Sequence, residues 1–168
     1  RAIRAARGKY LTNANTDDRH RPDALEKMVR HLESNPDAVL VYANQDYYRD
    51  NDGTRKFAFN RRRPAYSRAA LLDDCCVGSQ PMWRATVHEE FGYFDEAFFT
   101  AGDYEFWLRI SQRHDFVHLD ETLGDRLLRA DSLEYDGNSF LSQFETALIR
   151  KSYYYALLYG FEIGKAGI

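Results

Sequence analysis

Apolar residues along the chain fall into short continuous runs that alternate with stretches of helical spacing. Runs of strand length occur at residues 10–14, 38–43 and 116–119. The run 38–43 has no polar interruption, which predicts a strand buried on both faces. Apolar positions three and four apart predict helices over residues 22–34, 103–113 and 139–159. This alternation predicts an α/β fold with a mostly parallel sheet flanked by helices.

The helix over residues 22–34 has a defined start, a defined end and one apolar face. Pro22 lies in its first turn, where a missing N–H costs nothing, and Asn35–Pro36 ends it. We expect strands 10–14 and 38–43 to be neighbours in the sheet. The helix should pack on them through its apolar face, which consists of Leu25, Met28, Val29 and Leu32.

Three further elements follow from local patterns. Turn-forming residues 50–53 between the aromatic positions 47–48 and 57–59 predict a hairpin. Residues 81–90 predict a strand edge that runs into a short helix. The helix over 103–113 is expected to be amphipathic, with Phe106, Trp107 and Ile110 on its apolar side. The helix over 139–159 is expected to use a face formed by Phe140, Phe144, Ala147 and Leu148.

Composition and charge exclude some classes of protein. A formal net charge of −3 is not that of a nucleic-acid-binding protein, which usually has a strong positive excess. The two cysteines, Cys75 and Cys76, are adjacent, so no disulfide framework is expected and a reducing cytoplasm fits best. The longest apolar run is far too short for a transmembrane segment. The first eight residues read as the end of a helix closed by Gly8, without an initiator Met, so we expect a fragment of a longer domain.

The first candidate chemistry is the acidic pair Asp17–Asp18, which directly follows the first strand. Ligands of open α/β sheets bind at the carboxyl ends of strands. Two carboxylates on a tight turn supply the hard oxygen ligands that Mg²⁺ and Mn²⁺ prefer. The alternative is that one of them caps the following helix or solvates the turn.

The stretch from Ala6 to Leu25 resembles the central segment of glycosyltransferase family 2, which shows a helix ending in A-x-G-x-Y, a strand, an Asp-x-Asp-Asp motif, a Pro and a Leu. The resemblance implies the GT-A fold, a Rossmann-like fold of nucleotide-diphospho-sugar transferases. It also implies that Asn15 contacts the donor ribose in place of the family's first Asp. Asp17 would then bind a divalent metal, Mn²⁺ or Mg²⁺, with Asp18 in support.

A second stretch, Glu90 to Arg109, resembles the family's G-x-F-D-E segment and the acidic motif that opens an acceptor-side helix. The resemblance places Asp103 at the general base of inverting members. The alternative is a plain N-cap for the following helix, with Glu105 as the next candidate base. Asp95 reads as a structural turn residue. Trp107 is either a stacking residue for an acceptor sugar or part of the core.

Two weaker matches complete the candidate site. The stretch from Arg126 to Ser132 resembles the family's Y-R-x-H-x-x-S motif and aligns Arg129 with a His near the diphosphate. A guanidinium there would bind phosphate, and the alternative is a surface arginine. Gly78 and Ser79 fall on the segment that precedes the acceptor-side helix, which marks them as candidate acceptor contacts.

The resemblance implies an inverting hexosyltransferase that moves sugar from a nucleotide-diphospho-sugar to a saccharide or lipid-linked acceptor, typical of bacterial surface polysaccharide synthesis. We expect a partial GT-A domain over residues 1–135 and a helical extension over 136–168, inactive alone and prone to self-association. It would be cytoplasmic or peripheral at the inner face of the membrane. Two alternatives stay open: a non-catalytic carbohydrate-binding or interaction module, favoured by Asn15 and Gly102, and a metal-dependent phosphohydrolase using Asp17 and Asp18.

Overall fold

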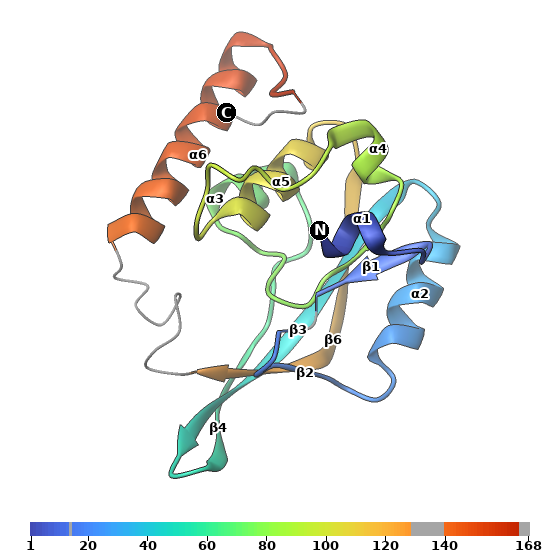
Figure 1. Cartoon of the computed structure of the whole chain (residues 1–168), viewed down its shortest axis with the longest axis vertical. Coiled ribbons are helices and arrows are strands. Elements are labelled where there is room, and N and C mark those ends of the chain that lie inside the picture. Colours follow the sequence, from blue (N-terminus) through green and yellow to red (C-terminus); the bar gives the residue numbers. More distant parts are fainter. Residues whose placement is uncertain (14, 129–139, 165–168) are drawn as a thin grey trace.

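The computed structural model of the 168-residue chain describes residues 1–13, 15–128 and 140–164. Strands and helices alternate along this α/β structure (Figure 1). The helices are α1 (Ala2–Ala5), α2 (Ala24–Ser34), α3 (Arg68–Asp73), α4 (Val87–Phe91), α5 (Gly102–Ser111) and α6 (Phe140–Tyr159). The strands are β1 (Tyr10–Thr12), β2 (Arg19–His20), β3 (Ala38–Asn51), β4 (Thr54–Arg61), β5 (Met82–Arg84) and β6 (Asp115–Leu128).

The described strands form one six-stranded mixed sheet. Its order is β1-β5-β3-β6-β2, and β4 pairs with β3 in a hairpin. Within the described chain β3 and β6 pair in parallel, whereas the other pairings are antiparallel. The α/β class is therefore as predicted, but the sheet is mixed rather than mostly parallel.

The predicted pairing of the first two strands is wrong in one respect. β5 lies between β1 and β3, because Leu11 and Leu40 both pair with Trp83 rather than with each other. β5 has only three residues, so its sequence carries little signal for a central position. Ala14, at the end of the predicted first strand, lies outside the described residues.

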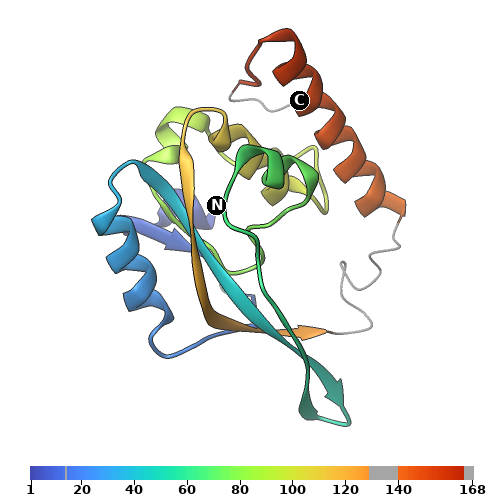
Figure 2. The same ribbon diagram turned by 180° about the vertical axis from the view of Figure 1, so that it is seen from behind.

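Both faces of β3 are covered, which explains its uninterrupted apolar start. Leu40 and Tyr42 face a core shared with α3, α5 and α6, whereas Val41 and Ala43 face a second core shared with α2. Figures 1 and 2 show α2 on one side of the sheet and α3, α5 and α6 on the other. Beyond these cores, the β3–β4 hairpin projects away from the helices (Figure 1). This confirms the predicted hairpin.

The buried face of α2 differs slightly from the predicted one. Ala24, Met28 and Leu32 are buried, and Val29 is partly buried against the same core. Leu25 is 45% exposed and does not belong to the buried face. The helix begins at Ala24 with Asp23 at its N-cap, so neither Asp17 nor Asp18 caps it.

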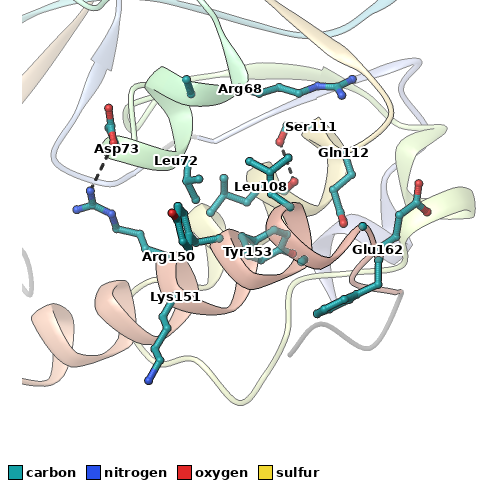
Figure 3. Close-up of a pocket in the computed structure, with 16 residues that line it drawn as sticks. Arg68, Leu72, Asp73, Leu108, Ser111, Gln112, Arg150, Lys151, Tyr153 and Glu162 are labelled. Carbon is teal, nitrogen blue, oxygen red and sulfur yellow. Dashed lines mark hydrogen bonds and ion pairs between the residues drawn. The ribbon is translucent and has the colours of Figure 1, made fainter.

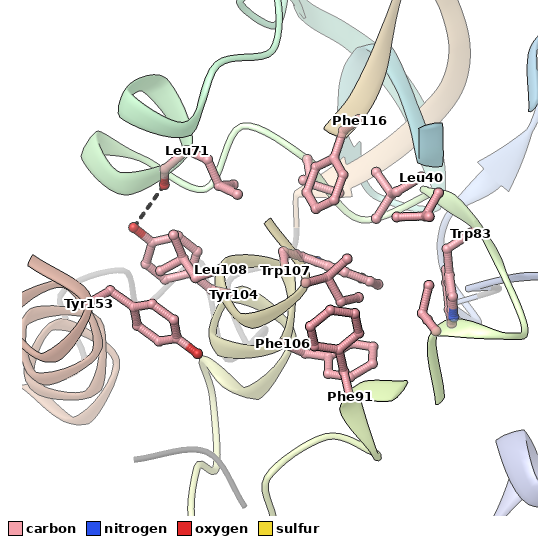
Figure 4. Close-up of a cluster of buried hydrophobic side chains, with 14 of the residues drawn as sticks. Leu40, Leu71, Trp83, Phe91, Tyr104, Phe106, Trp107, Leu108, Phe116 and Tyr153 are labelled. Carbon is pink, nitrogen blue, oxygen red and sulfur yellow. Dashed lines mark hydrogen bonds between the residues drawn. The ribbon is translucent and has the colours of Figure 1, made fainter. Parts of the chain in front are cut away.

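Helix α5 is buried on all sides rather than amphipathic (Figure 4). Every residue from Tyr104 to Ser111 is buried, including the ion pair between Glu105 and Arg109, whose atoms are 2.6 Å apart. The hydroxyl of Tyr153 on α6 donates to Oε1 of Glu105 at 2.7 Å. A buried ion pair needs such additional hydrogen bonds to offset the loss of hydration.

Helix α6 packs through the face opposite to the predicted one. Its buried residues are Glu145, Ile149, Tyr153 and Ala156. The expected face is exposed instead, by 81% at Phe140, 53% at Phe144 and 43% at Leu148. The helix has apolar residues on both faces, so periodicity alone could not select the buried one. The predicted domain boundary at 135/136 lies outside the described residues and stays a prediction.

Candidate active site

The acidic turn after β1 is held in place by the carboxylate of Asp18. Its Oδ2 accepts hydrogen bonds from Ser79 Oγ at 2.9 Å and from Asn15 Nδ2 at 3.0 Å. Its Oδ1 accepts a hydrogen bond from the backbone N–H of Leu127 on β6 at 3.3 Å. These contacts tie the turn both to the segment before β5 and to the sheet.

A buried polar network lies next to Ser79. Gln45 Nε2 donates to Ser79 Oγ at 3.1 Å and to Gln80 Oε1 at 3.0 Å. Gln45 Oε1 accepts a hydrogen bond from Arg63 Nη2 at 3.2 Å. Gln45 and Arg63 are both buried, and burial lowers the pKa of the Arg63 guanidinium. Because buried polar groups are costly unless they are hydrogen-bonded, the network favours one arrangement of the Ser79 segment.

Gly78 is required by this network. Its φ is +79°, a conformation that side chains rarely adopt. A Cβ added there would lie 2.7 Å from Gln45 Oε1 and 2.9 Å from Arg63 Nη2. The structure thus gives Gly78 a packing role, and its role as an acceptor contact stays a prediction. Sequence reasoning missed Gln45 and Arg63, because their partners are distant along the chain.

The two carboxylates of the turn differ in their contacts, because the oxygens of Asp18 accept hydrogen bonds from the described part of the protein whereas those of Asp17 do not. The backbone oxygen of Asp17 accepts a hydrogen bond from Arg55 Nη2 at 2.8 Å, which fixes the main chain of the turn. Within the described residues its carboxylate makes no hydrogen bond or ion pair. These residues contain no group of three or more His, Cys, Asp or Glu that would hold a metal by itself. The carboxylate of Asp17 can nevertheless supply one ligand to a divalent cation that takes its other ligands from phosphate and water, as Mg²⁺ commonly does, while Asp18 holds the turn.

Asp103 lies in the first turn of α5 and is not its N-cap; its role as a general base stays a prediction. The N-cap position is Ala101, and the carboxylate of Asp103 accepts its hydrogen bond from the N–H of Tyr104 at 2.7 Å. Burial raises the pKa of Asp103, while that hydrogen bond and the charge of Arg126 act in the opposite direction. A carboxyl with a raised pKa is a stronger general base than an ordinary Asp.

The turn that leads to Asp103 is held from α6 by Glu145. Its carboxylate accepts hydrogen bonds from the backbone N–H of Phe99 at 2.8 Å, Thr100 at 2.8 Å and Ala101 at 3.0 Å, and from Thr100 Oγ1 at 2.6 Å. Burial acts to raise the pKa of Glu145, but these hydrogen bonds outweigh it and lower that pKa. The sequence signal that could have revealed Glu145 is its isolation as the one acidic residue in the apolar segment 140–159.

Arg126 connects the two acidic positions. It lies on β6 opposite Tyr47, with its guanidinium 5.5 Å from the ring centroid and Nη1 3.4 Å from the hydroxyl. Burial raises the pKa of Asp103, and the charge of Arg126 acts against that rise, so the two groups are within electrostatic reach. The next residue, Leu127, binds Asp18 through its N–H. β6 therefore binds Asp18 through the N–H of Leu127, and the neighbouring Arg126 acts on Asp103 through its charge.

Two predicted roles are corrected by burial. Trp107 is 0% exposed and lies against Trp83 at a centroid distance of 5.2 Å, so it belongs to the core and cannot stack on an acceptor (Figure 4). Glu105, the alternative base, is also 0% exposed and is ion-paired with Arg109. Arg129 lies outside the described residues, and its phosphate-binding role stays a prediction.

A groove of about 800 Å³ lies elsewhere, between α3, α5 and the exposed edge of α6 (Figure 3). Its walls are mostly aliphatic and aromatic, and they include Leu72, Leu108 and Tyr153. None of the predicted site residues that the structure describes lines it. Size alone does not make it the reactive site, because Asp17, Asp18 and Asp103 lie outside it.

The structure is of the α/β class, and comparison with known proteins identifies its family and, with it, the GT-A fold. Residues 1–91, more than half of the chain, match glycosyl transferase family 2. The chain belongs to this family. No helix among residues 1–13, 15–128 and 140–164 has the length and apolar character needed to cross a membrane.

Individual relatives agree with the family assignment. The chain is 33% identical over 112 residues to an uncharacterised protein of Sinorhizobium fredii, covering 67% of this chain and 12% of that protein. It is 28% identical over 131 residues to an uncharacterised glycosyltransferase of Methanocaldococcus jannaschii, covering 73% and 43%. It is 26% identical over 132 residues to a chondroitin synthase of Escherichia coli, covering 78% and 19%. The chain thus spans less than half the length of these relatives.

Proposed function

We propose that this chain contributes the metal-binding turn and the catalytic base of an inverting hexosyltransferase. The enzyme would move a sugar from a nucleotide-diphospho-sugar to a hydroxyl group of a saccharide or lipid-linked acceptor. Membership of glycosyl transferase family 2 supports the reaction class. The observation that carries the proposal is the position of Arg126, which lies beside the anchor of Asp18 and within electrostatic reach of Asp103.

Asp103 would act on the acceptor hydroxyl. Its carboxylate takes the proton while the acceptor oxygen forms a bond to the anomeric carbon. The bond from that carbon to the diphosphate breaks on the opposite face, and its electron pair leaves with the nucleoside diphosphate. The raised pKa of Asp103 supports this role, because a base that binds a proton more tightly assists its removal better.

The donor would bind at the acidic turn. Asn15 has its Nδ2 committed to Asp18, which leaves its carbonyl oxygen to accept a bond from a ribose hydroxyl. Asp17, supported by Asp18, would hold Mn²⁺ or Mg²⁺, which would neutralise charge on the diphosphate leaving group. Arg129 would add a further contact to phosphate.

The loop before β5 and the exposed face of α6 bear on the acceptor and on the location of the enzyme. Gly78 and Ser79 would border the acceptor, since Ser79 contacts the acidic turn directly. A match to a protein named chondroitin synthase supports a saccharide acceptor, as in surface polysaccharide synthesis. The free thiols of Cys75 and Cys76 support a reducing, cytoplasmic location. The exposed apolar side chains of α6, such as Phe140 and Leu157, support a peripheral position at the inner face of the membrane.

Nucleotide binding tests this proposal without knowledge of the sugar. UDP, GDP and dTDP are each titrated into the intact protein with and without Mn²⁺, using calorimetry. We expect one of them to bind in a Mn²⁺-dependent manner. Asp17→Asn should abolish that binding and Asp18→Asn should weaken it less, whereas Asp37→Asn, an exposed control, should leave it unchanged. Absence of metal-dependent binding, or undiminished binding in Asp17→Asn, would contradict the proposal.

A further inference from the structure

A row of three side chains crosses β4, β3 and β6 on one face of the sheet. Tyr47 in the centre pairs in register with Phe59 on one side and Arg126 on the other. The rings of Phe59 and Tyr47 are stacked, with centroids 4.7 Å apart and planes 15° apart. Arg126 lies over the Tyr47 ring at 5.5 Å from its centroid. The row therefore extends outward from the arginine that acts on Asp103.

Exposure rises along this row. Tyr47 is 3% exposed, whereas Phe59 is 43% exposed. The hydroxyl of Tyr47 is held by Arg63 Nη2 at 3.2 Å, so the ring is fixed in place. Phe59 thus has one face packed on a rigid partner while part of the ring is open to solvent. Such a ring is preorganised for a flat ligand, because binding costs it little conformational freedom.

An irregularity in the hairpin separates Phe59 from its nearest aromatic neighbour in sequence. The β3–β4 register shifts between Tyr47 and Tyr48, which pair with Phe59 and Phe57 respectively. Consecutive strand residues point to opposite faces, so Tyr48 faces away from Tyr47. Phe57 contacts Tyr48 edge-on, with centroids 5.9 Å apart. Phe59 therefore shares a face with Tyr47 and Arg126, and Phe57 lies on the other face.

We propose that Phe59 is the stacking platform for a pyranose ring of the acceptor. This inference rests on the proposed function and adds a subsite for a sugar beyond the one that reacts. The C–H face of a pyranose is apolar and flat enough to pack on an aromatic ring through dispersion and burial, while its hydroxyl groups stay at the edge in water. The ring of Phe59 is 43% exposed on the projecting hairpin, so a sugar ring can reach it while its own hydroxyl groups remain in water.

The experiment uses the 168-residue chain and simple saccharide probes. Cellotriose, maltotriose and triacetylchitotriose are each titrated, with binding followed by saturation-transfer NMR. We expect at least one trisaccharide to bind. Phe59→Ala should weaken its binding by about tenfold, the range expected for loss of a stacked aromatic ring. Phe59→Trp should bind the trisaccharide about as well as the unaltered chain does, because it keeps a flat aromatic face.

Phe57→Ala is the matched control, because it removes the same ring from the opposite face of the same hairpin. It should change trisaccharide affinity by less than about twofold, within the scatter of surface substitutions. Thermal melting verifies that each variant folds. Three results would overturn the proposal: no trisaccharide binds the unaltered chain, the two alanine variants weaken binding equally, or Phe59→Ala weakens nucleotide binding in the intact protein and spares the sugar.

The proposed reaction is tested separately, because trisaccharide binding requires neither donor nor turnover. If binding does not depend on Phe59 while Asp103 remains essential for transfer, only this inference fails. If binding depends on Phe59 but the intact protein neither binds nucleotide nor transfers sugar, the proposed reaction fails and the subsite stands as a carbohydrate-binding site.

Discussion

The hydroxyl of Ser79 donates a 2.9 Å hydrogen bond to Oδ2 of Asp18, which joins two segments that lie 61 residues apart in the chain. Through Ser79 the acidic turn is connected to Gln45 and to the buried guanidinium of Arg63. The position of the turn therefore depends on the interior of the protein and not only on local turn chemistry.

Removing the Ser79 hydroxyl should loosen the acidic turn. Ser79→Ala is expected to lower the free energy of unfolding by about 1 kcal/mol, the usual contribution of one intramolecular hydrogen bond. Urea denaturation measures this change. Thr16→Ala is the control, because Thr16 carries an exposed hydroxyl in the same turn. Equal stability of the two variants would mean that the Ser79 contact does not hold the turn.

Glu145 should stabilise the fold in a pH-dependent manner. Glu145→Gln is expected to lower the free energy of unfolding at pH 7 by about 2 kcal/mol, because hydrogen bonds to a charged group are worth more than neutral ones. The lowered pKa of Glu145 means that this stabilisation is present above its unfolded pKa, near 4.5. It is lost as the pH falls through the still lower folded pKa.

The difference between the unaltered chain and Glu145→Gln should therefore shrink below about pH 4.5, near the unfolded pKa of Glu. Denaturation curves at several pH values measure it. Glu96→Gln, at an exposed position, provides the comparison and should show little difference at any pH. A destabilisation that stays constant between pH 7 and pH 3.5 would contradict the role of the charge.

Two adjacent residues of α6 lie on different faces of the helix. Ile149 lies on the buried face that the structure shows, and Leu148 lies on the face that the sequence predicts to be buried. Ile149 is 0% exposed and Leu148 is 43% exposed. Ile149→Ala should cost about 2–4 kcal/mol, as deletion of buried methyl groups usually does. Leu148→Ala should cost less than about 1 kcal/mol. Thermal melting of both variants measures the contrast, and a larger loss for Leu148→Ala would mean that α6 packs through the other face.

Local patterns predicted most of the elements, because they depend on neighbouring residues. The buried run at 38–43, the hairpin around 50–53 and the short helix before Gly92 all appear in the structure. The pattern could not place β5 between β1 and β3, since pairing depends on residues far apart in sequence. It also could not choose between the two apolar faces of α6.

The candidate site shows the same difference between local and long-range information. Asp17, Asp18 and Asp103 stand in recognisable local motifs, so their positions could be proposed from the sequence. Their partners could not. Gln45 binds Ser79, which is 34 residues away, and Glu145 binds backbone groups that are 44 to 46 residues away. For Trp107 the sequence left two interpretations open, a ligand contact and a core residue, and its complete burial selects the second.

The pKa of Asp103 also predicts the thermal stability of the Asp103→Asn variant. Burial raises the pKa of Asp103, which means that the folded state favours the protonated carboxyl. Asp103 therefore stabilises the fold when it is protonated at low pH, and its ionised form destabilises the fold at neutral pH. Asp103→Asn removes this charge while keeping an acceptor for the N–H of Tyr104. The variant should therefore melt at least as high as the unaltered protein at pH 7. Its advantage should decrease as the pH falls towards the unfolded pKa of Asp, about 3.9.

The most direct test of the central claim is sugar transfer by the intact protein carrying Asp103→Asn, measured with donor affinity and melting temperature. Asp95→Asn is the matched control, because among the contacts described the carboxylate of Asp95 accepts only a local hydrogen bond, from the N–H of Ala97 at 2.9 Å. We expect Asp103→Asn to fold and bind donor normally, and to transfer sugar slower by about two to four powers of ten. Near-normal transfer by a folded, donor-binding Asp103→Asn protein would show that Asp103 is not the base.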